Sequence, residues 1–214
     1  MTEPVDWYFD VISPFAWLQW QRLQRDHPAL AARLRPVPVL LAGLLAHHRT
    51  LGPAETPGKR RFTYRHVLWR ARRDGLHLTF PPAHPFNPLP ALRLILAAGG
   101  SHAAVAAVLD HVWGQGRAGD GAAALEPVAG RLGIADVAAA IADPGVKARL
   151  QANTAAAIAA GVFGVPTLAI AGETFWGDDA TAMAADWLAD RAGFEDPAMR
   201  ALEVLPAAVQ RRTD

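Results

Sequence analysis

The stretch that most constrains the fold lies near the N-terminus, where Val5-Asp-Trp-Tyr-Phe-Asp-Val11 leads through Ile12 into Ser13-Pro14-Phe15. The first segment is rich in aromatic and β-branched residues, which suit a buried strand. Ser13 is a strong helix N-cap, and Pro14 suits the first helical position because no N–H is needed there. The sequence therefore predicts a strand over 5–11 that runs directly into a buried helix over 14–26.

Ser13 is also a candidate functional residue. A helix that starts at a sheet edge presents unpaired N–H groups and the positive end of its dipole, which favour an anion such as a thiolate. The alternative is that Ser13 only caps the helix, which is a common role for serine. A second stretch, Gly161-Val-Phe-Gly-Val165-Pro166-Thr167, precedes a short strand. We expect the two stretches to form one site that holds a thiol cofactor.

Composition excludes several classes of protein. The 214 residues carry a formal charge of +1 and are 51% hydrophobic, so we expect a globular protein that binds neither nucleic acid nor a membrane surface. No apolar run reaches the roughly 18 residues of a membrane span, and no signal-peptide pattern is present, so we expect a cytoplasmic protein. The chain has no cysteine, which excludes disulfides and a redox cycle based on its own sulfur. His47 and His48 are adjacent and point apart, so no metal site is expected.

The remaining pattern indicates the order of elements. A strand over 33–41 contains Pro36 and Pro38, which place it at a sheet edge, parallel to the first strand. A helical block over 42–150 follows. A hairpin over 167–171 and 173–176 turns at Ala171-Gly172, and a helix to about 191 follows with Asp178 or Asp179 as its N-cap. The tail adds at most one helix around 197–210. The helices expected from 59 to 161 cover 59–74, 89–98, 101–113, 121–132, 134–142 and 144–161.

Two parts of the helical block carry candidate binding residues. The loop over 80–88 is too rich in proline for regular structure, and its His84, Phe86 and Asn87 are candidates for substrate contact, with plain packing as the alternative. The helix over 59–74 should expose most of its basic residues to solvent, while one or two could serve an anionic substrate. These basic residues are Lys59, Arg60, Arg61, Arg65, Arg70, Arg72 and Arg73.

This order of elements is that of an α/β, thioredoxin-like fold with a large all-helical insertion. We expect residues 1–41 and 151–214 to form the thioredoxin-like domain and residues 42–150 to form the inserted helical domain.

The segments FDVISPFAWL, PGKRRFTYRH, HPFNPLPALR, GVFGVPTLAI and GETFWGDD resemble the 2-hydroxychromene-2-carboxylate isomerase family. That family is related to kappa-class glutathione transferases and to bacterial disulfide oxidoreductases of the same fold. The resemblance implies that Ser13 is catalytic and stabilises a glutathione thiolate, without a metal. Ser13 and Ala16 stand where the redox relatives have their two cysteines.

The resemblance also implies a glutathione-binding set. The backbone of Val165 would pair with the cysteine part of glutathione beside a cis-Pro166, and the segment formed by Trp176, Gly177, Asp178 and Asp179 would hold the γ-glutamyl end. The implied reaction is cis–trans isomerisation of a small aromatic compound during aromatic degradation, by a possible homodimer. The alternatives are a kappa-like transferase that conjugates electrophiles and a non-catalytic module that binds thiols or peptides. The arginine that often follows this segment in the family is Ala180 here. Leu45 and residues 52–55 stand where family members place a substrate-binding lysine and asparagine.

Overall fold

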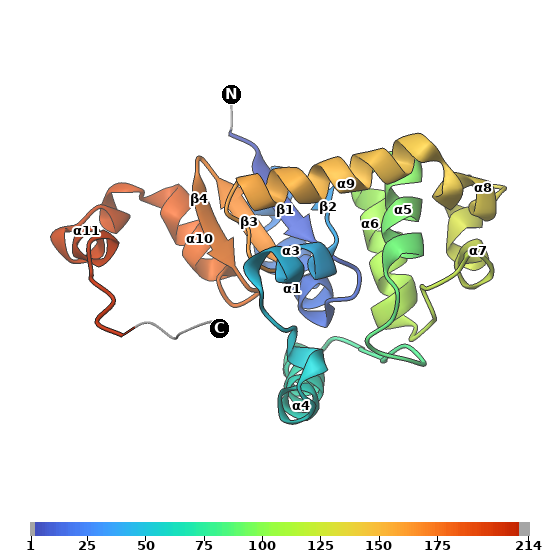
Figure 1. Ribbon diagram of the computed structural model, residues 1–214, viewed down its shortest axis with the longest axis horizontal. Helices are drawn as coiled ribbons and strands as arrows, with labels where there is room; N and C mark the ends of the chain where they lie inside the picture. Colours follow the sequence, from blue (N-terminus) through green and yellow to red (C-terminus); the bar gives the residue numbers. More distant parts are fainter. Residues whose placement is uncertain (1–2, 210–214) are drawn as a thin grey trace.

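A four-stranded sheet forms the centre of the protein in the computed structural model, which describes residues 3–209 (Figure 1). The strand order is β2-β1-β3-β4, with β1 parallel to β2 and β3 antiparallel to both of its neighbours. The strands are β1 (Val5–Phe9), β2 (Leu34–Pro38), β3 (Thr167–Ile170) and β4 (Glu173–Trp176). The expected parallel pair and the edge position of the proline-containing strand are both confirmed.

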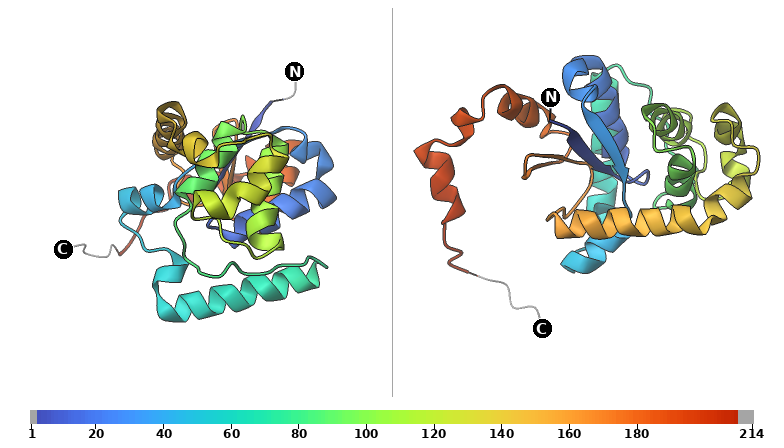
Figure 2. Two further views of the ribbon diagram at one scale, coloured as in Figure 1. Left: turned by 90° about the vertical axis from the view of Figure 1, so that its right-hand side faces the viewer. Right: turned by 90° about the horizontal axis from the view of Figure 1, so that it is seen from above.

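Helices cover both faces of the sheet. Side chains alternate between the two faces along β1, and both faces carry apolar side chains that the helices bury. Trp7 and Phe9 are fully buried and pack toward α1 (Pro14–Asp26) and α10 (Thr181–Ala189), and the rings of Trp7 and Trp20 lie 5.2 Å apart. Tyr8 points to the other face, where it packs in a second cluster with α3 (Leu41–His48) and α9 (Pro144–Ala159). Figure 2 shows α9 running along the sheet and on into the helical block. The thioredoxin-like arrangement of the predicted α/β fold is thus present.

The helical block lies between β2 and β3 in the chain. Its helices after α3 are α4 (Pro57–Arg73), α5 (Leu89–Ala97), α6 (His102–Leu109), α7 (Ala122–Arg131) and α8 (Val137–Ala142). Two expected helices are shorter than predicted. The α-helix expected over 101–113 ends at Leu109, and the chain continues as a π-helical turn from Asp110 to Gly114. Helix α8 starts only after Asp136, whose side chain accepts a hydrogen bond from the N–H of Ala139.

The division into domains stays a prediction. The expected boundary between residues 150 and 151 falls inside α9, which contacts α5 and α8 at its start and α3 and β2 further along. Helix α9 is therefore continuous across the expected boundary and contacts both the block and the sheet.

The remaining elements follow local signals closely. Gly75 has a φ of +69° just after α4, as expected of a residue that ends a helix. Ala171 and Gly172, both at positive φ, form the tight turn of the β3–β4 hairpin. Two short helices complete the fold, α2 (Pro28–Ala31) and α11 (Pro197–Glu203), and residue 210 of the expected tail helix lies outside the described residues. Across residues 3–209, no helix combines the length and apolar character needed to cross a membrane.

Candidate active site

Ser13 lies at the first turn of α1 and is only 6% exposed. Its Oγ accepts a hydrogen bond from the N–H of Ala16 at 3.3 Å, which confirms the predicted N-cap. Its hydroxyl proton has no acceptor within residues 3–209, and the N–H of Phe15 has no partner in the same part of the chain. Two hydrogen-bond donors therefore remain for an anion at the positive end of the helix dipole.

The Val165–Pro166 peptide bond is cis, as the resemblance implies. Tyr8 pairs with Thr167 in the antiparallel pair, so β1 ends and β3 begins at the same end of the sheet. Ser13 follows the end of β1, and Val165 precedes the start of β3, which brings both predicted stretches to that end. The backbone N–H and C=O of Val165 have no partner among residues 3–209. This short backbone edge is therefore open to pairing with an extended ligand.

Gln19 connects the two stretches, although the sequence analysis did not single it out. Its buried side chain accepts from Trp7 Nε1 at 2.6 Å and donates to the carbonyl of Gly177 at 3.1 Å and to Thr181 Oγ1 at 2.9 Å. The N–H of Gly177 in turn donates to the carbonyl of Pro166 at 2.8 Å. The available signal was an amide placed directly between Leu18 and Trp20 in a helix expected to be buried, because a buried amide needs partners.

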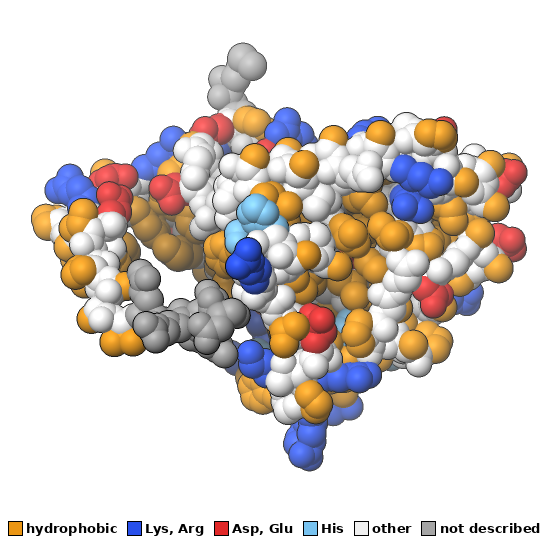
Figure 3. All heavy atoms as spheres, in the orientation of Figure 1, with side chains coloured by type: hydrophobic (Ala, Val, Ile, Leu, Met, Phe, Trp, Pro, Cys, Tyr) orange, Lys and Arg blue, Asp and Glu red, His pale blue; other side chains and the backbone are white. Residues whose placement is uncertain are grey.

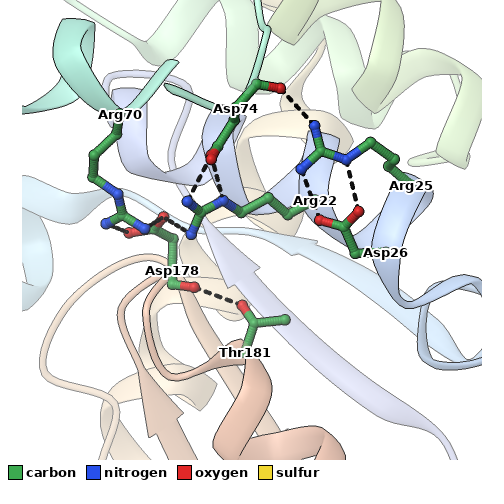
Figure 4. A network of polar contacts seen from close by, with 7 residues as sticks. All are labelled: Arg22, Arg25, Asp26, Arg70, Asp74, Asp178 and Thr181. Carbon is green, nitrogen blue, oxygen red and sulfur yellow. Dashed lines mark hydrogen bonds and ion pairs between the residues drawn. The ribbon is translucent and has the colours of Figure 1, made fainter. Parts of the chain in front are cut away.

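The structure separates the two aspartates that the sequence left as equivalent. The Asp178 side chain is 2% exposed and forms a two-pronged ion pair with Arg70 of α4, at 2.8 and 2.7 Å, while Arg22 of α1 lies 3.4 Å away (Figure 4). Burial raises the pKa of the Asp178 carboxyl above its ordinary value, and the two guanidinium groups oppose that shift. Asp179 is exposed and stays available to a ligand.

The predicted N-cap of the following helix is wrong. Helix α10 begins at Thr181, and the cap position is Ala180, which makes no side-chain cap hydrogen bond. The carboxyl of Asp178 turns instead toward Arg70, which offers two charge-assisted hydrogen bonds in place of the one backbone N–H of a cap. The hydroxyl of Thr181 donates to the carbonyl of Asp178 at 2.7 Å.

Trp176 and Gly177 flank the cis-proline loop. The Trp176 ring is 56% exposed and lies against the backbone of Gly164, where an added Cβ would sit 2.6 Å from its Nε1. The ring of Phe163 packs edge-on to it at 5.2 Å. Gly177 has a φ of +94°, which a side chain would disfavour. The Trp176 ring thus covers the loop, while the backbone of Gly177 carries the contact to Pro166.

The three loop residues proposed for substrate binding are engaged within the protein. His84 Nε2 lies 2.8 Å from the carbonyl of Ile12, and Asn87 Oδ1 accepts from the N–H of Leu89 at the start of α5. Phe86 is half-buried and packs edge-on to His84 at 6.1 Å. His84 therefore contacts the Ser13 turn itself, and Asn87 is exposed beside a helix start.

Most basic residues of α4 are exposed, as predicted, and they gather at the lower tip of the molecule in Figure 3. Arg70 is the exception, since its side chain is largely buried against Asp178. Arg60 donates to the carbonyl of His84 at 2.7 Å. The long-range partners of these two arginines could not be read from the local pattern.

Asp10 is a buried acid that directly follows β1. It is fully buried, and its two carboxyl oxygens accept from the N–H of Ile12 at 3.0 Å and the N–H of Leu41 at 2.8 Å. Burial raises its pKa to about 7, because the two backbone donors only partly offset the cost of desolvating the charge. Asp10 thereby joins the Ser13 turn to the start of α3.

We predict that Arg70→Met lowers the free energy of unfolding by about 3 kcal/mol, because it leaves Asp178 buried without its main countercharge. Urea unfolding measures the effect. Arg65→Met is the matched control, since Arg65 is an exposed arginine of the same helix. Adding Asp178→Asn to Arg70→Met should restore much of the loss. Equal stability of the two single arginine variants would contradict this assignment.

The fold and the turn define a thioredoxin-fold protein in which a serine occupies the start of the first helix and no cysteine is present. The chain belongs to the DsbA-like thioredoxin domain family, which matches residues 4–189.

Within this family, the chain is similar to 2-hydroxychromene-2-carboxylate isomerases. It is 30% identical over 184 residues to the enzyme of that name from Pseudomonas putida, covering 82% of this chain and 89% of the relative. The solved structure of a 2-hydroxychromene-2-carboxylate isomerase matches 89% of this chain and 96% of its own, with a TM-score of 0.76 and 26% identity. The resemblance seen in the sequence is thereby confirmed.

A more distant neighbour supports the fold alone. The structure of the oxidoreductase DsbA from Xylella fastidiosa matches 90% of this chain and 88% of its own, with a TM-score of 0.54 and 17% identity.

Proposed function

We propose that this protein is a glutathione-dependent cis–trans isomerase that acts on a small aromatic compound, in the manner of 2-hydroxychromene-2-carboxylate isomerases. The observation that carries the proposal is that a free Ser13 hydroxyl at a helix start and an open Val165 backbone lie at the same end of the sheet. The relationship to an enzyme named as an isomerase supports the reaction class.

The residues present fit glutathione. The open N–H and C=O of Val165 suit the peptide backbone of its cysteine part, and the exposed Asp179 suits an ammonium group at its γ-glutamyl end. We therefore assign the ammonium contact to Asp179. Asp178 is already paired with Arg70 and instead holds the segment in place through buried charge.

Glutathione would supply a thiol whose ionised form adds reversibly to a conjugated carbon and so permits rotation about the former double bond. A free thiol has a pKa near 8.5 and is mostly protonated at neutral pH. Ser13 would donate a hydrogen bond from its hydroxyl to the sulfur anion, and the N–H of Phe15 with the helix dipole would add to the stabilisation. In this proposal Ser13 stabilises charge and is not itself a nucleophile.

The proposal extends to setting and partners. We place the reaction in the cytoplasm, where the glutathione pool is kept reducing, and propose a small aromatic or electrophilic substrate and homodimer assembly. The alternative, a transferase built on the same cofactor site, is separated by its product: an isomer with glutathione regenerated, or a thioether.

We predict that glutathione raises the thermal midpoint of the protein by roughly 5–10 °C at a hundred times its dissociation constant, since a ligand that binds only the folded state stabilises it. Differential scanning fluorimetry measures the shift. The control ligand is a glutathione analogue with alanine in place of cysteine, which should give a smaller shift. The absence of any shift at millimolar glutathione would overturn the cofactor assignment.

A further inference from the structure

Two side chains of the helical block hold the backbone immediately before Ser13. Trp113 Nε1 donates to the carbonyl of Val11 at 2.8 Å, and His84 Nε2 lies 2.8 Å from the carbonyl of Ile12. Both residues are distant in sequence from the turn, by 102 and 72 positions respectively. The orientation of the peptide that leads into Ser13 is therefore set from outside the thioredoxin-like part of the chain.

The contact at Ile12 fixes the protonation of His84. A carbonyl oxygen only accepts hydrogen bonds, so Nε2 must carry a proton. Burial lowers the pKa of the His84 imidazole, the hydrogen bond to the Ile12 carbonyl opposes that shift, and the nearby Arg60 guanidinium lowers the pKa further, so the neutral ring is favoured. In a neutral imidazole with Nε2 protonated, Nδ1 is an acceptor and needs a donor.

Tyr64 of α4 supplies that donor. Its hydroxyl oxygen lies 2.6 Å from His84 Nδ1 and 2.8 Å from the His84 carbonyl, but a hydroxyl has one proton to give. The His84 carbonyl already accepts from Arg60 at 2.7 Å, whereas Nδ1 has no other donor among the described residues. Arg60 Nε also donates to the Tyr64 hydroxyl at 3.1 Å. The hydrogen-bond order is therefore Arg60, Tyr64, His84 and the Ile12 carbonyl.

Aromatic packing fixes the plane of the imidazole. Rings from α4, the proline-rich loop and the π-helical turn meet His84 at angles between 65° and 78°. The centroid distances are 5.2 Å to Tyr64, 6.4 Å to Phe80, 6.1 Å to Phe86 and 5.4 Å to Trp113. Edge-on contacts of this kind favour one ring orientation over others.

We infer that His84, with its tautomer set by Tyr64, is a positioning residue that orients the Ile12 carbonyl and thereby holds the Ser13 hydroxyl in place to meet a sulfur anion. Both ring nitrogens of His84 are committed to hydrogen bonds, so it acts through the turn and not as an acid or base. This inference rests on the proposed function, because it concerns the same thiolate site.

Two variants test the inference in the full-length protein. His84→Phe keeps an aromatic ring and removes both nitrogens, whereas Tyr64→Phe removes only the hydroxyl that fixes the tautomer. His77→Phe is the matched control, because His77 is an exposed histidine whose ring contacts only the Thr79 hydroxyl among the hydrogen bonds of residues 3–209. Binding of glutathione is measured by calorimetry, and the pKa of the bound thiol is measured from the ultraviolet absorbance of the thiolate.

We expect both test variants to bind glutathione, with the pKa of the bound thiol raised by roughly one unit, since a misplaced hydroxyl loses its differential stabilisation of the anion. The control should leave that pKa unchanged. His84→Gln retains an N–H donor and should raise the thiol pKa less than His84→Phe does. Should His84→Phe fail to fold, Tyr64→Phe decides the question.

The failure of this inference is distinguishable from failure of the proposed function. If the wild-type protein binds no glutathione, the proposed function fails. If the wild-type protein binds glutathione and Ser13→Ala raises the thiol pKa while Tyr64→Phe and a folded His84→Phe do not, the positioning role of His84 is wrong.

Discussion

Replacing Ser13 by alanine is expected to reduce the rate of isomerisation by roughly a hundredfold, which is the usual effect of removing one donor from a charge-stabilising site. The Ser13 hydroxyl is nearly buried, so its hydrogen bond to an anion would compete little with water. Steady-state kinetics with glutathione and a 2-hydroxychromene-2-carboxylate give the rate, and the pKa of the bound thiol should rise in parallel.

Ser101 offers a matched control for this variant. It caps α6 as Ser13 caps α1, and its Oγ accepts from the N–H of Ala104 at 3.2 Å. Both alanine variants should lose about 1 kcal/mol of stability through the lost cap. Only Ser13→Ala should lose activity. Equal kinetics for the two variants would mean that Ser13 is merely a cap and would remove the central support for the proposed mechanism.

Asp10→Asn is expected to change how stability depends on pH. The folded-state pKa of Asp10 is raised from 3.8 to about 7, so the folded protein retains a proton that the unfolded chain releases. The stability from this proton is fully present below the unfolded pKa and is lost as pH rises through the folded pKa. A gap of about three units, each worth ~1.4 kcal/mol, amounts to about 4 kcal/mol.

The measurement is urea unfolding of the wild-type and Asp10→Asn proteins across the range from about pH 4 to about pH 8. The difference between their free energies of unfolding should fall steadily with rising pH. Because His84 and the other titrating groups are common to both proteins, their contributions largely cancel. A difference that stays constant with pH would show that Asp10 is ionised throughout and that its two backbone donors outweigh its burial.

Elements with strong local signals were predictable from the sequence. Ser13 and Pro14 marked the start of α1, because both act on the backbone groups next to them. Pro36 and Pro38 placed β2 at the edge of the sheet, since proline lacks the N–H that an inner strand needs. The turn at Ala171-Gly172 was readable for the same reason, because its backbone conformation depends on its own residues.

The errors arose where distant residues decide the local structure. Asp178 appeared to be a helix cap, but its side chain pairs with Arg70, which is 108 positions away in the sequence. Its charge is satisfied by a helix that the local pattern could only describe as basic. The π-helical turn at 110–114 likewise interrupts a helix where no proline or unusual run of residues marks the change.

The candidate site shows the same division. The sequence proposed Ser13, Val165 and Pro166 as site residues because motif and order locate them, and the structure brings both stretches to one end of the sheet. It proposed His84 for substrate contact, which stays a prediction, and the structure adds a contact between His84 and the carbonyl of Ile12 that the sequence did not indicate. Gln19 and Asp10 were passed over, since each lies among apolar neighbours and its partners become visible only when α1, α3 and the loop after β4 are assembled.

Helix α4 is fastened to the rest of the molecule at two points. Near its N-terminal end, Arg60 and Tyr64 are bonded to His84, and toward its C-terminal end Arg70 is paired with Asp178. An outward swing of the whole helix would have to break a buried ion pair and release the imidazole at the same time. We therefore expect α4 to act as a fixed wall of the site, and small molecules to enter and leave through rotations of individual side chains.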